Sequence, residues 1–190
     1  MQQINVTMNN YCAHLNVPFP LFKESFNLSQ LLKIQHFKLD KDEVLNDDLQ
    51  NWFKLLKLEV FLVEVFYTPP NESGVIHIDS TGIDYTKLNW QFGGKDSVMN
   101  WYSEITPNSY KKTTTAIGST TTLFKEQDVT KIYSDSIQSP SLIQVAVPHN
   151  IDNFSEDRWA VSVVYKYPNT FYQRPTWAES LSIFNEYLIQ

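Results

Sequence analysis

His77 and Asp79 stand two residues apart in the segment VIHIDSTG, residues 75–82, which is typical of a strand that ends in a turn. Side chains at positions i and i+2 of a strand point to the same face. An imidazole and a carboxylate on one face are two ligands for a divalent metal ion. His149, in the segment VPHN, would complete the two-histidine, one-carboxylate facial triad that holds non-haem Fe(II). The alternatives are a turn capped by Asp79 and a loop histidine after Pro148.

Arg158 follows nine residues after His149 and opens the apolar run RWAVSVVY, which is typical of a strand. This order of H-x-D, a distant histidine and an arginine at a strand start resembles the Fe(II)/2-oxoglutarate-dependent dioxygenases. The resemblance covers roughly residues 60–167 by strand spacing. Segments 87–94 (KLNWQFGG) and 97–102 (SVMNWY) are also similar to small oxygenases of this class from phage and bacterial genomes.

The resemblance implies a fold, a metal and a reaction. The fold is a double-stranded β-helix, and the metal is Fe(II) held by His77, Asp79 and His149. The cosubstrate is 2-oxoglutarate, which is oxidised to succinate with O2 while a C–H bond of the substrate is hydroxylated. A peptide or protein side chain is the first candidate substrate, by analogy with relatives of similar core size.

Arg158 is the expected partner for the distal carboxylate of 2-oxoglutarate, because a guanidinium pairs bidentately with a carboxylate. Strand alternation places Ser162 on the same side, where its hydroxyl would donate to that carboxylate. Family members often carry Ser or Thr two residues after the arginine, where this chain has Ala160. The alternative for Arg158 is a surface ion pair with Asp157 or Glu156.

Asn89 shares one face of its predicted strand with Lys87 and Gln91. Polar side chains that face a barrel interior need partners. We expect Asn89 to point inward and to contact cosubstrate or substrate. If this face is turned outward instead, the three side chains are solvated.

The fold class follows from a change of sequence period near residue 59, after which apolar residues alternate with polar ones. Many short strands with turns between them predict a sandwich or barrel and argue against a parallel α/β fold. We therefore expect a mainly β protein with a double-stranded β-helix (jelly-roll, cupin-like) core and flanking N-terminal and C-terminal helices. The predicted strands are 60–67, 75–79, 87–92, 98–102, 113–124, 129–133, 142–147 and 159–167. The threonine runs within 113–124 suit strands or an edge hairpin.

A chain of 190 residues is most simply one domain, 1–190. The core is expected at about 60–167, with N-terminal support over 1–58 and a C-terminal helix within 176–189. An amphipathic stripe predicts a helix over 40–58, which would alternatively begin at Asn46 as its cap. A second helix is predicted over 177–188, capped by Thr176.

The composition restricts partners and compartment. A net charge of -6 without a basic cluster argues against nucleic acid as a partner. The single cysteine, Cys12, excludes an internal disulfide and is expected to be a small buried thiol. His14 and His36 are interpreted as structural or surface histidines. The chain begins without a signal-peptide pattern and has no apolar run of membrane length, so a cytoplasmic protein without a membrane partner is expected.

Two other functions fit the same residues. A cupin-like metal enzyme would use the metal without 2-oxoglutarate, and dependence of O2 uptake on that cosubstrate separates it from the dioxygenase. A non-catalytic β-sandwich, such as a binding or phage structural module, would show no tight metal binding.

Overall fold

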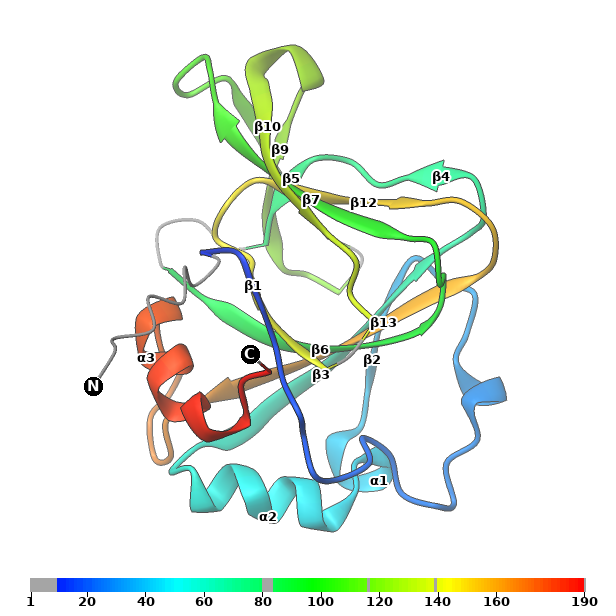
Figure 1. Cartoon of the computed structure of the whole chain (residues 1–190), viewed down its shortest axis with the longest axis vertical. Helices are drawn as coiled ribbons and strands as arrows, with labels where there is room; N and C mark the ends of the chain where they lie inside the picture. The colour runs from blue at the N-terminus through cyan, green and yellow to red at the C-terminus, as the bar shows by residue number, and fades with distance from the viewer. Residues whose placement is uncertain (1–9, 80–83, 116, 139, 190) are drawn as a thin grey trace, which may run out of the picture.

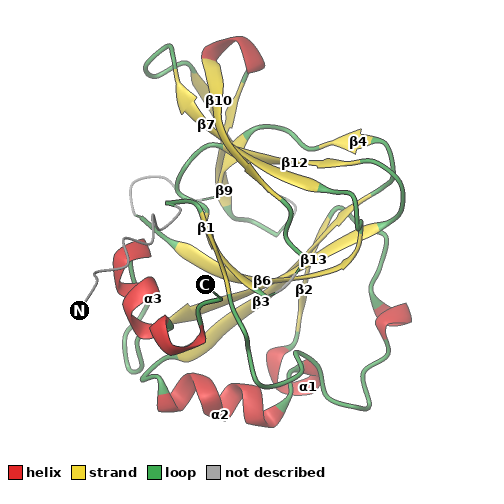
Figure 2. Ribbon diagram, viewed as in Figure 1, coloured by secondary structure: helices red, strands yellow, loops and turns green. Residues whose placement is uncertain are grey.

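The computed structural model describes residues 10–79, 84–115, 117–138 and 140–189 (Figure 1). Over these residues the protein is mainly β, as predicted, with two antiparallel sheets and helices outside one of them (Figure 2). Ser80, Thr81 and Gly82, which belong to the predicted turn after Asp79, lie outside the described residues. No helix in the described ranges has the length and apolarity needed to cross a membrane.

The first sheet lies beside the helices in Figure 2. It has six described strands in the order β1, β11, β6, β13, β3, β2. Their bounds are β1 Cys12–His14, β11 Ser141–Gln144, β6 Thr86–Gly93, β13 Arg158–Lys166, β3 Glu59–Thr68 and β2 His36–Leu39.

The second sheet has the order β10, β7, β12, β5, β9, β8, with the short β4 also paired to β12, counted over the described residues. Its strands are β10 Val129–Asp135, β7 Val98–Glu104, β12 His149–Asn153, β5 His77–Ile78, β9 Thr120–Phe124, β8 Tyr110–Thr114 and β4 Glu72–Ser73.

Eight of these strands pair like the two arms of one long antiparallel hairpin. Starting from the tip, β7 pairs with β10, β6 with β11, β5 with β12, and β3 with β13. Successive pairs lie alternately in the second and the first sheet. The hairpin β8–β9 is inserted between the two strands of the tip and extends the second sheet beside β5.

The two faces of the first sheet have different neighbours, because side chains alternate along a strand. On β6, Leu88 and Trp90 belong to the main apolar cluster, which also contains residues of the helices. Lys87 and Asn89 point the other way and line a cavity. The predicted alternation of this strand is therefore confirmed, with the polar face turned inward.

The predicted helix over 40–58 is divided in two, so its continuity was wrong. α1 is Lys41–Val44 and α2 is Asp47–Leu55. Leu45 between them is extended and fully buried. The side chain of Asn46 accepts hydrogen bonds from the backbone N–H groups of Asp48 and Leu49, so a strong N-cap starts the second helix.

The C-terminal helix is shorter than predicted. α3 covers Trp177–Ile183, and the 3-10 turn η3 covers Asn185–Tyr187. Thr176 caps α3 as predicted, in a capping box with Glu179. The remaining short 3-10 turns are η1 Leu28–Gln30 and η2 Glu126–Asp128.

Two strand predictions need correction. The threonine-rich segment 113–124, for which strands or an edge hairpin were expected, is not one strand but lies in the edge hairpin β8–β9, because the chain turns at Gly118, whose φ is +84°. His149 lies in a strand, β12, and not in a loop. The segment HNIDN carries only one apolar residue, so its pattern does not reveal a strand that is paired on both sides.

Candidate metal centre

His77, Asp79 and His149 come together between the sheets, as the sequence predicts. Antiparallel pairing places His149 of β12 directly opposite His77 of β5, so both rings lie on one face. Their ring centroids are 4.5 Å apart, and His77 Nε2 lies 3.0 Å from Asp79 Oδ1. One ligand atom from each residue lies within 4.8 Å of the other two. The residues are thus a compact set of two imidazoles and one carboxylate.

Both imidazoles are oriented by backbone carbonyls. His77 Nδ1 lies 2.9 Å from the carbonyl oxygen of Val75, and His149 Nδ1 lies 2.8 Å from that of Val147. An Nδ1–H that donates to a carbonyl leaves the Nε2 lone pair available for a metal ion. His149 therefore has the tautomer that a ligand at Nε2 requires, and His77 has it once the proton between its Nε2 and Asp79 has left.

Burial and neighbouring charges set the protonation of the triad. Burial and the nearby His77 lower the pKa of His149 to about 4, so this ring is neutral at physiological pH. For Asp79, burial raises the pKa, but Lys87 and His77 outweigh it and hold the pKa well below its usual range. Burial alone would lower the pKa of His77, but the carboxylate of Asp79 outweighs burial, so the pKa of His77 lies above its ordinary value. A divalent cation would displace any proton held between these two side chains.

Lys87 and Glu64 hold the carboxylate of Asp79 in place through a chain of ion pairs. The Lys87 ammonium lies 2.6 Å from Asp79 Oδ2 and 2.6 Å from Glu64 Oε2, and it is buried. It binds the Asp79 oxygen that faces away from His77, which leaves Oδ1 directed at the histidines. Sequence reasoning assigned no role to either residue, although a single glutamate within the apolar strand run 60–67 is a signal for a paired buried charge.

The carboxylate of Glu64 makes folding stability depend on pH. Burial raises the pKa of Glu64, but the Lys87 ammonium and the nearby His36 outweigh burial and lower the pKa to about 2, against about 4.5 for a free glutamate side chain. Because the folded pKa is the lower one, the stabilisation is complete above pH 4.5 and is lost as pH falls towards 2. We expect on the order of 3 kcal/mol at neutral pH. Urea unfolding of Glu64→Gln should show a flatter pH dependence between pH 5 and 2.5 than the wild type.

Glu59→Gln is the matched control for this experiment. Glu59 is also on β3 and forms an ion pair with Lys166, but its side chain is 40% exposed. Exposed ion pairs contribute roughly 0–1 kcal/mol, so this variant should follow the wild-type pH curve. Equal curves for wild type and Glu64→Gln would contradict the role given to Glu64.

Arg158 lies in the same cavity as the triad. This cavity has a volume of about 150 Å³, and its lining includes His77, Asp79, His149 and Arg158. Arg158 is only 3% exposed, and burial lowers its pKa to about 10, so it keeps its charge. Three separate strands and the residue after β5 thus place a cationic group and a metal-ligand set around one small cavity.

Arg158 is hydrogen-bonded to neutral groups only, as far as the described residues show. Its Nε donates to Gln91 Oε1 at 3.0 Å and to Ser97 Oγ at 3.2 Å, and no described carboxylate lies within ion-pair distance. The ion pair with Asp157 that we considered does not form, because Asp157 binds Lys33 and the hydroxyl of Tyr67. A buried arginine without an acidic partner is a strong site for an anionic ligand.

Ser162 and Asn89 lie where alternation predicts. Both line the cavity together with Ala160, and Ser162 is buried. Ser162 and Asn89 are register partners on the neighbouring strands β13 and β6. Asn89 Oδ1 is buried and has no hydrogen-bond partner. A buried amide oxygen without a partner is a polar group left for a ligand or a water molecule to satisfy.

A larger cavity opens on the other side of the triad. It has a volume of about 580 Å³ and shares His77, Asp79 and Lys87 with the small one. The hairpin β8–β9 contributes a wall of threonines, and Tyr172 and Arg174 contribute another part of the lining. A volume of this size falls in the range of about 300–1,000 Å³ that holds organic ligands, whereas the small cavity suits a smaller molecule.

Comparison with known proteins does not assign this chain to a family. No protein-family model matches the chain, and a search of the curated proteins finds no significant match.

Proposed function

We propose that this protein is an Fe(II)- and 2-oxoglutarate-dependent dioxygenase that hydroxylates a C–H bond. One observation carries the proposal: a His77–Asp79–His149 set and a buried Arg158 without an acidic partner line the same small cavity. The first supplies metal ligands, and the second supplies a binding site for a carboxylate. Sequence resemblance to this class of enzymes points the same way.

The strand pairing supports a double-stranded β-helix for this chain. A long hairpin whose successive pairs alternate between two sheets is the winding of a jelly roll. In this arrangement β5 and β12 carry His77 and His149 in the second sheet, with Asp79 directly after β5, while β13 and β6 carry Arg158 and Asn89 in the first. The cavity between the sheets therefore receives the metal from one wall and the acid from the other.

The residues present fit both groups. The two Nε2 atoms and Asp79 Oδ1 would hold Fe(II), and three protein ligands leave positions open on an octahedral ion. Bound iron and 2-oxoglutarate would together reduce O2, releasing succinate and CO2 and placing one oxygen atom in the substrate C–H bond. Lys87 holds Asp79 in place, and Arg158 and Ser162 orient the acid so that its keto-acid end faces the triad.

The large cavity is the proposed place for the organic substrate, because it reaches His77 and Asp79 without passing Arg158. Arg174 in its wall is 7% exposed, and its guanidinium lies 4.3 Å from the ring centroid of Tyr85. A peptide or protein side chain remains the first candidate substrate, and a cavity volume of about 580 Å³ admits one.

Anaerobic titration tests the proposal. Apo-protein is loaded with Fe(II), 2-oxoglutarate is added, and the visible metal-to-ligand charge-transfer band of the chelated keto acid is followed. Succinate release under air is then measured with and without candidate peptides. We expect a saturable band and slow succinate formation that requires both iron and 2-oxoglutarate.

The other outcomes identify the alternatives. Iron binding without a charge-transfer band would exclude 2-oxoglutarate as the cosubstrate and favour a cupin-like metal enzyme. Neither iron binding nor a band in folded protein would favour a non-catalytic β-sandwich module.

Gly94 provides a further prediction about the acid site. Its φ is +58°, and a Cβ at this position would lie 2.6–2.9 Å from Cβ, Cγ and Cδ of Arg158. An alanine at position 94 would therefore force the aliphatic part of the Arg158 side chain to move. We expect Gly94→Ala to raise the 2-oxoglutarate concentration needed for half-saturation of the charge-transfer band about tenfold or more, with Fe(II) binding retained.

Gly118→Ala is the control for backbone strain. Gly118 also has a positive φ, +84°, but a Cβ there would meet nothing within 4 Å. Any general cost of a left-handed alanine appears in this variant as well. If both variants lose 2-oxoglutarate affinity equally, displacement of Arg158 is not the cause.

A further inference from the structure

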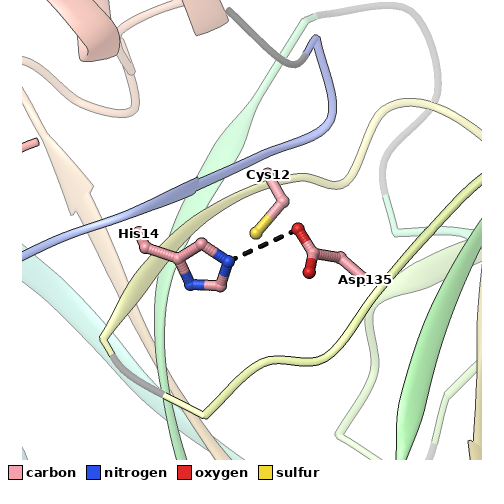
Figure 3. Close-up of side chains that lie close together, drawn as sticks. All are labelled: Cys12, His14 and Asp135. Atoms are coloured by element: carbon pink, nitrogen blue, oxygen red, sulfur yellow. Dashed lines mark hydrogen bonds and ion pairs between the residues drawn. The ribbon is translucent and has the colours of Figure 1, made fainter. Parts of the chain in front are cut away.

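A second group of metal-ligating side chains lies away from the first, at one edge of the sheets. Cys12 and His14 are two residues apart on β1, so they share one face of that strand. Asp135 is the last residue of β10. Figure 3 shows the thiol, the imidazole and the carboxylate pointing toward one another, and their ligand atoms lie within 4.8 Å of one another.

The position of this group in the fold is informative. In the described part of the chain, β1 is the edge strand of the first sheet and pairs only with β11. β10 is the edge strand of the second sheet and pairs only with β7. The three side chains therefore lie between the edges of two sheets whose described strands β1 and β10 are not paired with each other. Residues 12 and 135 are far apart in sequence, so a bond between them would close a long loop.

The hydrogen bonds around the group orient its donor atoms. His14 Nδ1 lies 2.9 Å from Ser141 Oγ, which directs Nε2 at Asp135. The Tyr133 hydroxyl donates to Asp135 Oδ2 at 2.9 Å, and the Ser136 N–H donates to Oδ1 at 2.8 Å. Metal ligands in proteins usually have hydrogen bonds of this kind from neighbouring groups that do not touch the metal.

The distances also suit one small ion. His14 Nε2 and Asp135 Oδ2 are 3.4 Å apart. Two N and O ligands of a tetrahedral zinc ion, each at about 2.0–2.2 Å from the metal, are separated by ~3.4 Å. Cys12 Sγ lies within 4.8 Å of both atoms, so a small movement of its side chain would bring it into bonding distance of the same ion.

From these observations we infer that Cys12, His14 and Asp135 form a structural zinc site that fastens the edge of one sheet to the edge of the other. Thiolate, imidazole and carboxylate are a borderline-soft donor set that suits Zn²⁺, whereas the two imidazoles and carboxylate of the first site suit Fe(II). A water molecule would complete four-coordination. The burial of Cys12 argues against a nucleophilic role, since reactive thiols are partly exposed.

Cobalt is the probe that reports the thiolate directly. Full-length apo-protein is titrated anaerobically with Co²⁺, and the near-ultraviolet sulfur-to-cobalt charge-transfer band is recorded. We expect a saturable band in the wild type that is absent in Cys12→Ser and needs at least about tenfold more cobalt in the isosteric Asp135→Asn. His149→Ala, which removes a ligand of the first site only, should keep the band.

Zinc binding should also stabilise the fold. In the His149→Ala background, which lacks a ligand of the first site, we expect a free Zn²⁺ concentration 100 times the dissociation constant to raise the Tm by about 5–10 °C, and to raise it much less when Cys12→Ser is added. Circular dichroism shows whether each variant is folded. The inference is overturned if folded wild-type protein gives no thiolate band, or if the band persists unchanged in both His14→Ala and Asp135→Asn. Neither result depends on iron, 2-oxoglutarate or turnover, so this site is tested separately from the proposed function.

Discussion

His149→Ala is expected to abolish 2-oxoglutarate turnover and to weaken Fe(II) binding by more than about 100-fold. The ring is neutral and directs Nε2 at the other two ligands, so its removal takes away a metal ligand outright. Even residues one shell further out typically change metal affinity by 10–100-fold. Loss of the charge-transfer band and of succinate release, with Fe(II) affinity measured by competition with a chelator, checks this prediction.

His149 is a cleaner target than Asp79. Removal of the Asp79 carboxylate would also take away one of the two carboxylate partners of buried Lys87, so a loss of iron binding would not report on the metal ligand alone. The matched control is His14→Ala, which removes a histidine from the other cluster. It should keep iron-dependent turnover. Wild-type turnover by folded His149→Ala would contradict the assignment of the metal site.

Arg158→Ala is expected to leave Fe(II) binding intact and to raise the 2-oxoglutarate requirement by about 100-fold or more. Truncation of one partner of a buried, hydrogen-bonded charge pair costs roughly 2–5 kcal/mol, which corresponds to about 30-fold to several thousand-fold in affinity. Arg158→Lys should recover part of this loss, because it restores the charge but not the bidentate geometry. Titration of the charge-transfer band at fixed iron measures the effect.

Asp157→Asn is the control for Arg158. Asp157 precedes the arginine but binds Lys33 and Tyr67, and it is not part of the lining of the small cavity. This variant should therefore bind 2-oxoglutarate as the wild type does. If Arg158→Ala and Asp157→Asn weaken 2-oxoglutarate equally, or if neither does, the carboxylate site assigned to Arg158 is wrong.

Local periodicity accounts for what the sequence by itself determined. Alternation over two residues predicts that His77 and Asp79 share a face and that Lys87 and Asn89 point away from Leu88, and the structure confirms both. The capping positions Asn46 and Thr176 were also readable, because a cap is made by a side chain and the next few backbone N–H groups.

The partners of buried charges were decided by tertiary structure. Nothing local to Lys87 indicates that it lies between Glu64 and Asp79, and nothing near Arg158 indicates Gln91 and Ser97 as its neighbours. These contacts depend on the register of strands that are distant in sequence. A one-residue slip of any of these strands would turn the side chain to the opposite face.

The same reason explains the two metal-ligand groups. His77 and Asp79 could be paired from their spacing, but only the antiparallel register of β5 with β12 places His149 opposite His77. Cys12 and His14 have the same i, i+2 spacing, yet His14 was interpreted as structural because its carboxylate partner, Asp135, is far along the chain. Spacing determines which side chains share a strand face, while sheet pairing and the packing of two sheets determine which faces meet.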